Sequence, residues 1–197
     1  MERVVIYIKH NLKFLWRVID WSNGLLFSIL FKARMERVVG NILETNQNEN
    51  FVYRRINTSD LSSLYEMLNS QDEHDFDYFK PHKFDIHSLE KQLKAKSFLM
   101  MGVFDNGEII GYFFLRFLIL KKCFVGRIID KRYRGKGIGQ VMNMILYKIA
   151  WGMSFRCFST ISKHNAAIMH AHSKNDSALL RKELNDDYLL VEFVFKK

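Results

Sequence analysis

The feature that most constrains this chain is the glycine-rich segment RGKGIG at residues 134–139. It directly follows residues 122–130, which predict a strand, and it precedes the helical apolar pattern of residues 140–151. Glycines at such a junction let backbone N–H groups turn toward a ligand, and the start of a helix adds partial positive charge. The segment is therefore expected to form an anion cradle that holds a pyrophosphate.

Two better-known glycine loops do not fit this segment. A Walker A loop needs Gly-Lys-Ser/Thr, whereas Lys136 is followed by Gly137. A dinucleotide-binding loop needs the spacing G-x-G-x-x-G, whereas the three glycines here are spaced G-x-G-x-G. Neither a nucleoside-triphosphate loop nor a Rossmann loop is expected.

The elements around the loop predict an α/β (α+β) domain, in which helices flank a mixed, mostly antiparallel central sheet. Asp105-Asn106-Gly107 is a hairpin turn between two strands, because Asn and Gly tolerate positive φ. The expected strands are 51–53, 98–104, 108–117, 122–130, 157–161 and 189–195, and the expected helices are 61–68, 88–96, 140–151 and 165–174.

The first forty residues differ from the rest. Apolar side chains recur at spacings of three and four from Val5 to Ile19, with basic residues between them, which predicts an amphipathic helix with a basic face. A break at Asn23-Gly24 and a second helix are expected to follow. The predicted organisation is a helical extension at 1–43, a linker at 44–50 and one domain at 51–197. Charged residues interrupt the apolar positions, so neither a transmembrane span nor a signal peptide is expected.

Three partners for the extension stay open: its own domain, a second subunit in a homodimer, or an acidic membrane surface contacted through residues 3–37. The formal net charge of +9 favours polyanionic partners, but no arginine-rich RNA-binding signature is present, so nucleic acid is ranked last. The two cysteines, Cys123 and Cys157, fit neither a disulfide framework nor a metal site. A cytoplasmic protein is expected, with a peripheral position at the inner membrane surface as the alternative.

Arg134, Gly137 and Gly139 match the Arg/Gln-x-x-Gly-x-Gly/Ala motif of the GCN5-related N-acetyltransferases, and the chain resembles that family over roughly residues 51–195. The resemblance implies acetyl-coenzyme A (acetyl-CoA) as co-substrate and no metal. It implies that coenzyme A (CoA) is bound by Ile128, Ile129, Arg134, Gly135, Lys136, Gly137, Ile138, Gly139 and Asn165.

The resemblance also implies direct attack of a primary amine on the thioester, with a backbone N–H of strand 125–130 stabilising the oxyanion. His172 stands where the family often has the tyrosine that protonates the departing thiolate. Candidates for the base are Asp130, at the end of the strand, and the polar-loop residues His74, Asp75 and His82, of which the two histidines are the substrate-side candidates; a water relay needs none of them.

The acceptor that this reading implies is the amine of a small molecule, with an amino sugar as one option. A hydroxyl acceptor is an alternative within enzymes. The other class is a catalytically degenerate module that binds CoA, or nothing, and serves in assembly; the non-tyrosine at His172 favours it.

Overall fold

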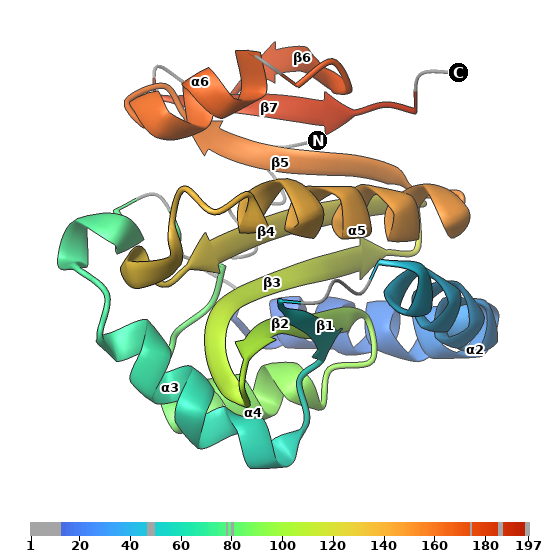
Figure 1. Ribbon diagram of the computed structural model, residues 1–197. Coiled ribbons are helices and arrows are strands. Elements are labelled where there is room, and N and C mark those ends of the chain that lie inside the picture. Colours follow the sequence, from blue (N-terminus) through green and yellow to red (C-terminus); the bar gives the residue numbers. More distant parts are fainter. Residues whose placement is uncertain are drawn as a thin grey trace.

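The computed structural model describes residues 13–46, 50–77, 79, 81–173, 175–184 and 187–195. Helices flank one mixed sheet, as the sequence predicts, and the sheet has seven strands (Figure 1). The helices are α2 (Lys13–Thr45), α3 (Leu61–Asn69), α4 (Ile86–Leu93), α5 (Ile138–Gly152) and α6 (Ala166–Ser173), with short 3-10 turns η1 (Thr58–Asp60), η2 (Glu73–Phe76) and η3 (Lys131–Tyr133). The strands are β1 (Val52–Arg55), β2 (Phe98–Asp105), β3 (Glu108–Leu118), β4 (Lys122–Ile129), β5 (Arg156–Ser162), β6 (Ala178–Glu183) and β7 (Tyr188–Phe193).

The strands lie in the order β1-β2-β3-β4-β5-β7-β6, and every neighbouring pair is antiparallel except β4 and β5. The predicted hairpin between β2 and β3 is present, with φ of +47° at Asn106 and +88° at Gly107. The parallel pair is joined by α5, because a crossover is the short route between parallel neighbours. This crossover places the start of α5 beside the end of β4.

Each face of the sheet has its own hydrophobic core. One face packs on α5 and α2, and its core includes Met142 and Ile145 of α5. The other face packs on α3 and α4, and its core includes Leu64 of α3 and Leu89 of α4. Side chains of β4 alternate between the two: Val125 belongs to the first core and Ile128 to the second.

The expected break at Asn23-Gly24 is wrong, because α2 runs through it as one helix. The Asn23 side chain does not end the helix; its amide nitrogen donates to the Phe117 carbonyl (2.9 Å) and its oxygen accepts from the Ile119 N–H (2.9 Å). Gly24 is buried, and a Cβ there would lie 3.9 Å from Ser97 Oγ. Contacts with the sheet therefore replace the turn that the Asn-Gly pair predicts.

The helix α2 is part of the domain's core rather than a separate appendage. Phe27 and Val39 are fully buried, and Phe27 stacks on Phe117 of β3 with ring centroids 4.9 Å apart. The predicted boundary at 44–50 thus divides the sequence but not the packing. The part of the predicted extension before residue 13 lies outside the described residues.

One of the seven strands, β6, is missing from the sequence prediction, which has the other six. It lies at the sheet edge beside β7, and five of its six side chains are exposed. It therefore lacks the alternation of apolar and polar residues that marks a strand. Among the described helices, none is both long and apolar enough to cross a bilayer.

Candidate functional site

The glycine-rich loop joins β4 to α5 in a conformation that requires glycine at two positions. Gly135 and Gly137 have φ of +79° and +78°, which L side chains rarely adopt. Gly137 is the N-cap of α5, and no side chain caps the helix there. The first-turn N–H groups of Gly137, Ile138 and Gly139 therefore lack partners inside the helix and face a loop without Cβ atoms at two of its positions.

The backbone of β4 offers further unpaired groups beside this loop. The strand pairs with β5 only from Lys122 to Phe124, and the two strands then diverge (Figure 1). Asp130 N–H donates to the Ile110 carbonyl of β3 (2.9 Å), and Lys121 C=O accepts from Arg156 at the start of β5 (2.8 Å). Successive residues of a strand point their N–H and C=O groups to opposite sides, so the backbone groups of the odd-numbered residues of β4 face β5. Past the last paired residue, these include the backbone groups of Arg127 and the N–H of Ile129, whose C=O accepts from Arg134.

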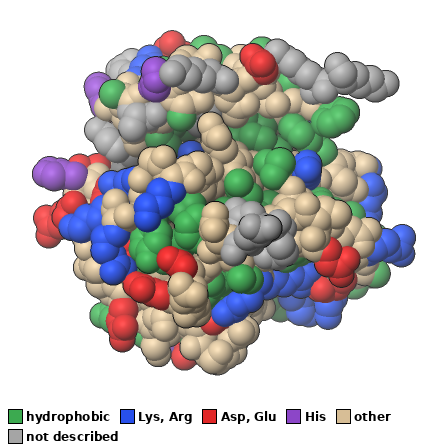
Figure 2. Space-filling view, in the orientation of Figure 1, with side chains coloured by type: hydrophobic (Ala, Val, Ile, Leu, Met, Phe, Trp, Pro, Cys, Tyr) green, Lys and Arg blue, Asp and Glu red, His purple; other side chains and the backbone are tan. Residues whose placement is uncertain are grey.

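Basic side chains gather where β4 leads into α5, next to acidic ones (Figure 2). Three of them form ion pairs: Lys131 with Asp72 at 2.8 Å, Arg132 with Asp130 at 2.7 Å and Arg134 with Asp75 at 2.8 Å. Asp75 Oδ2 nevertheless accepts no hydrogen bond within the described residues, so its contact with Arg134 is an ion pair by distance only. Lys136 has no carboxylate partner among those residues and lies 4.6 Å from the ring centroid of Tyr133.

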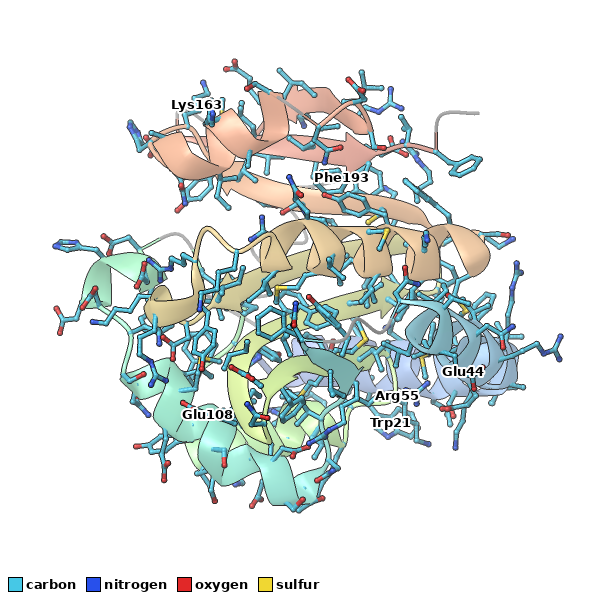
Figure 3. The ribbon with its side chains drawn as sticks, in the orientation of Figure 1. Trp21, Glu44, Arg55, Glu108, Lys163 and Phe193 are labelled. Atoms are coloured by element: carbon cyan, nitrogen blue, oxygen red, sulfur yellow. The ribbon has the colours of Figure 1, made fainter. Side chains whose placement is uncertain are left out.

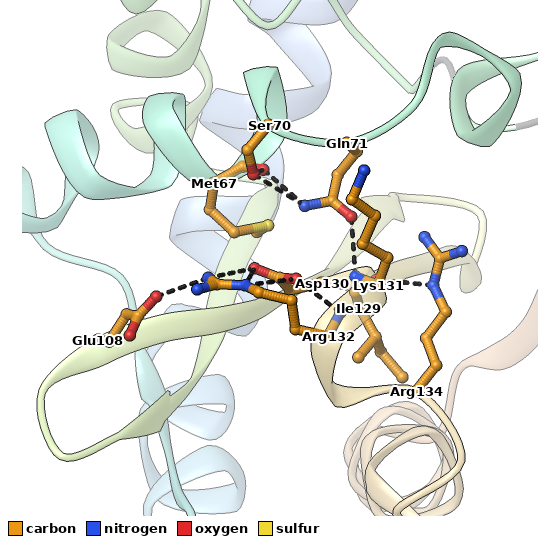
Figure 4. Close-up of polar contacts among 9 residues, drawn as sticks. All are labelled: Met67, Ser70, Gln71, Glu108, Ile129, Asp130, Lys131, Arg132 and Arg134. Carbon is orange, nitrogen blue, oxygen red and sulfur yellow. Dashed lines mark hydrogen bonds and ion pairs between the residues drawn. The ribbon is translucent and has the colours of Figure 1, made fainter.

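The carboxylate of Asp130, a candidate base, is hydrogen-bonded to Arg132. Its side chain is 1% exposed, and its two oxygens accept hydrogen bonds from Arg132 Nε and Nη2 and from the Arg132 backbone N–H (Figure 4). Burial alone would raise the pKa of Asp130, but these hydrogen bonds and the charge of Arg132 hold it below its ordinary value. The carboxylate stays ionised and fixes the start of η3.

The loop is also tied to α3. Gln71 Oε1 accepts a hydrogen bond from the Lys131 N–H (3.0 Å), and Gln71 Nε2 donates to the Met67 carbonyl (2.9 Å) (Figure 4). Arg134 Nε donates to the Ile129 carbonyl, one of the β4 groups that face β5 (3.2 Å). This hydrogen bond from Arg134 connects the loop to the end of β4.

The two substrate-side candidates have different surroundings. His74 is 97% exposed and lies 3.2 Å from Asp77 in η2's surface turn. His82 is half-buried on the α3 and α4 face, where Nδ1 lies 2.7 Å from the Lys83 carbonyl and Nε2 lies 2.9 Å from the Tyr112 hydroxyl. Since the carbonyl only accepts, Nδ1 carries the proton and Nε2 accepts from Tyr112. Burial lowers the pKa of His82, so its imidazole is neutral at pH 7.

The predicted CoA-binding residues do not all point the same way. The side chain of Ile128 lies in the core with α3, and that of Ile138 lies in the core with α5, so only their backbones border the loop. Asn165 Oδ1 accepts from the Ile168 N–H (3.0 Å) and so caps α6. His172 is in α6, but its side chain lies outside the described part of the chain.

The sequence analysis missed Arg127. This arginine is half-buried on β4, and its Nε donates to Asn143 Oδ1 of α5 at 2.8 Å. The sequence did carry a signal. Side chains of β4 alternate between the two faces of the sheet, so Arg127 shares a face with Val125 and Ile129, which pack in the core, and a charged residue is unusual there.

The loop fits a pyrophosphate. It presents helix N-terminal N–H groups and the exposed Lys136, and a Cβ on Gly137 would meet no atom within 4 Å, so the space in front of it is open. In the described residues, no group of three or more His, Cys, Asp or Glu side chains is placed to hold a metal ion.

A known protein family matches more than half of the chain. The model of the "Acetyltransferase (GNAT) family" matches residues 61–175. Among curated protein sequences, none matches the chain significantly.

Solved structures share its fold at low sequence identity. The PaiA N-acetyltransferase of Thermoplasma acidophilum, in complex with coenzyme A, is 17% identical, with a TM-score of 0.60 over 73% of this chain and 99% of that one. The GNAT domain of S. lividans PAT is 12% identical, with a TM-score of 0.62 over 72% and 88% of the two chains. The ribosomal-protein-S5-alanine acetyltransferase of Vibrio fischeri is 16% identical, with a TM-score of 0.59 over 75% and 94%.

Proposed function

The chain belongs to the acetyltransferase (GNAT) family, whose co-substrate is acetyl-CoA, and we propose that it transfers the acetyl group to the primary amine of a small molecule. The observation that carries the proposal is the loop between β4 and α5, where two left-handed glycines and three helix N–H groups without helical partners would bind a pyrophosphate. The strand that ends at this loop diverges from β5, which leaves backbone groups free beside the site.

In the proposed reaction, the chain's contribution is mainly positioning and hydrogen bonding. The N–H groups at the start of α5 and Lys136 would hold the pyrophosphate, and backbone groups of β4 that face β5 would hold the rest of the co-substrate. The Arg127 N–H, which lies beyond the part of β4 that pairs with β5, would donate to the acyl carbonyl as charge develops on its oxygen. The amine nitrogen bonds to the acyl carbon, the carbon–sulfur bond breaks, and no covalent bond to the protein is needed.

An amine acceptor is supported by the acidic segment that borders the loop. Residues 72–77 carry four carboxylates, and the Asp72 and Asp75 ion pairs fix this segment against the loop. Negative charge at the mouth of a site attracts a protonated amine. Amino sugars are the acceptor class that we propose to test first; three solved neighbours are named as acetyltransferases of ribosomal proteins, so alanine-terminated peptides form the comparison set.

We propose His82, rather than Asp130, as the proton acceptor on this side. His82 is neutral and accepts from Tyr112, and burial raises the pKa of Tyr112 well above its ordinary value, so the tyrosine stays protonated. In this relay the amine's proton would go to the Tyr112 oxygen as the Tyr112 proton goes to His82 Nε2. Both carboxylate oxygens of Asp130 accept hydrogen bonds from Arg132, so they are not available to an amine. We assign to His172, on α6, the role of protonating the departing thiolate, which then leaves as a thiol.

The experiment is a thiol-release assay with acetyl-CoA and a panel of amino sugars, polyamines, alanine-terminated peptides and the corresponding alcohols. Release that depends on an amine is the expected result. CoA binding without release for any acceptor would favour the degenerate module instead, and release with an alcohol alone would overturn the amine assignment.

With the best acceptor, His82→Gln should lower kcat about 100-fold, since a positioned general base contributes about 10²–10⁴-fold. His74→Gln, at an exposed position, is the matched control and should keep the rate. The wild-type rate should be level near neutral pH and fall only below pH 6.5, because burial lowers the pKa of His82 and keeps its imidazole unprotonated above that pH. If His82→Gln has an unchanged rate and pH profile, His82 is not the base, and a water relay would remove the proton instead.

We also propose that α2 makes a peripheral contact with an acidic membrane surface, within the predicted range 3–37. One stripe of the helix has exposed apolar side chains at spacings near four and seven: Phe14, Val18, Trp21 and Ile29, of which Phe14, Trp21 and Ile29 are 79%, 67% and 70% exposed. Exposed basic residues, Arg17 and Lys32, lie near the stripe in the sequence. Trp21 lies on α2 in Figure 3.

Sedimentation with vesicles tests this contact. The protein should bind vesicles containing phosphatidylglycerol more than pure phosphatidylcholine, and Trp21→Glu should abolish binding. Leu120→Glu is the control, since Leu120 is 77% exposed on the turn between β3 and β4. Absence of vesicle binding, with a dimer in solution that Trp21→Glu dissociates, would assign the stripe to a second copy instead.

A further inference from the structure

The side chain of Arg127 reaches underneath the first turn of α5. A Cβ built on Gly139 would lie 3.0 Å from Arg127 Nη1 and 3.1 Å from Cζ. Such distances are tighter than most real Cβ contacts, and Asn143, one helical turn further along α5, holds the guanidinium at this spot. The absence of a side chain at Gly139 is therefore what lets a charged group lie directly below the pyrophosphate loop.

This cation has no counter-charge in the described structure. Its Nε–H donates to the neutral Asn143 amide. Among the described residues, its two terminal nitrogens make no hydrogen bond and no carboxylate forms an ion pair with it. By contrast, Lys131, Arg132 and Arg134 are each neutralised by an aspartate. Burial lowers the pKa of Arg127, yet an arginine stays charged at neutral pH. A half-buried, uncompensated cation costs stability in the ligand-free protein.

We propose that Arg127 is a further positioning residue of the co-substrate site, which supplies the positive charge beneath the loop that balances the CoA pyrophosphate. The inference rests on the proposed function. Gly137, Ile138 and Gly139 contribute only N–H groups, and three nearby cations are already paired, so Arg127 and Lys136 are the loop's uncompensated charges among the described residues. Arginine suits the role because it stays charged when partly buried and its fork of donors matches phosphate oxygens.

The test compares CoA binding with stability in Arg127→Met. The variant should weaken CoA binding about 10-fold, the usual effect of losing one charge-assisted interaction. Binding of acetyl-pantetheine, which lacks the pyrophosphate, should change by less than about twofold. The Tm of the ligand-free variant should equal or exceed that of the wild type, because an uncompensated buried charge has been removed, while the Tm shift caused by CoA should shrink.

Two controls separate this role from others. Arg37→Met removes the same charge from an exposed position of α2 and should bind CoA as the wild type does. Arg127→Lys keeps the charge but not the fork, so its affinity should lie between those of the wild type and Arg127→Met. Unchanged CoA affinity in Arg127→Met, equal weakening of both ligands, or a lowered Tm of the free variant with an unchanged CoA shift would each overturn the inference. If the wild type itself binds no CoA, the proposed function fails instead.

Discussion

Gly137→Asp should raise the Kd for acetyl-CoA about 100-fold or more and abolish acetyl transfer. The carboxylate would enter the open space in front of the first turn of α5, where the pyrophosphate is proposed to bind. Placing like charges together costs several kcal/mol, and about 3 kcal/mol corresponds to roughly 100-fold in affinity. Calorimetric titration with acetyl-CoA measures the change directly.

Gly107→Asp is the matched control for this variant. Gly107 also has a positive φ, +88°, and a Cβ there also meets nothing within 4 Å, but it lies in the hairpin between β2 and β3. Both variants therefore share the backbone strain and the added charge, and only the first changes the loop. If the two bind acetyl-CoA equally well, the segment 134–139 is a structural turn and the proposed site is wrong.

Phe27→Ala should lower the free energy of unfolding by about 3–5 kcal/mol, the usual loss when a fully buried phenylalanine is truncated. Phe27 lies on α2 yet contacts residues that are distant in sequence: its ring stacks on Phe117 of β3 and lies 6.1 Å from Phe155, which precedes β5. The variant therefore asks whether α2 belongs to the core of the domain. Denaturation with urea, followed by circular dichroism, gives the loss.

Phe14→Ala on the same helix is the control. Its side chain is 79% exposed, so the same truncation should change the free energy of unfolding by less than about 0.5 kcal/mol. A loss below about 1 kcal/mol for Phe27→Ala would mean that α2 adds little to the stability of the domain, and that residues 51–197 fold independently, as the sequence suggested.

Much of the candidate site was predictable because its signal is local. The left-handed turns at Gly135 and Gly137 need glycine, so the residue types alone mark the loop. The protonation and pairing of the side chains were not predictable. Asp130 has the residue type of a base, but Arg132 and Glu108 enclose it in an ion-pair network, and Glu108 comes from the other end of a hairpin.

Arg127 shows the same limit from the opposite side. A lone arginine in a strand usually predicts a solvent-facing position. Here the side chain turns under α5, because Gly139 leaves space for the guanidinium and Asn143 accepts its Nε–H. Both partners lie more than ten residues away, so the sequence of β4 could not reveal them.

The sequence by itself determined the hairpin at Asn106-Gly107, the glycine loop, the period of α3 and α5, and the mixed sheet, because backbone φ preferences and apolar periodicity act between near neighbours. Tertiary structure decided what depends on distant partners. Side-chain bonds from Asn23 to the sheet kept α2 continuous, and pairing with β7 made a strand of the exposed residues 178–183. The divergence of β4 from β5 after Phe124 is likewise a product of packing, since each strand is regular on its own and only their relative placement opens the site.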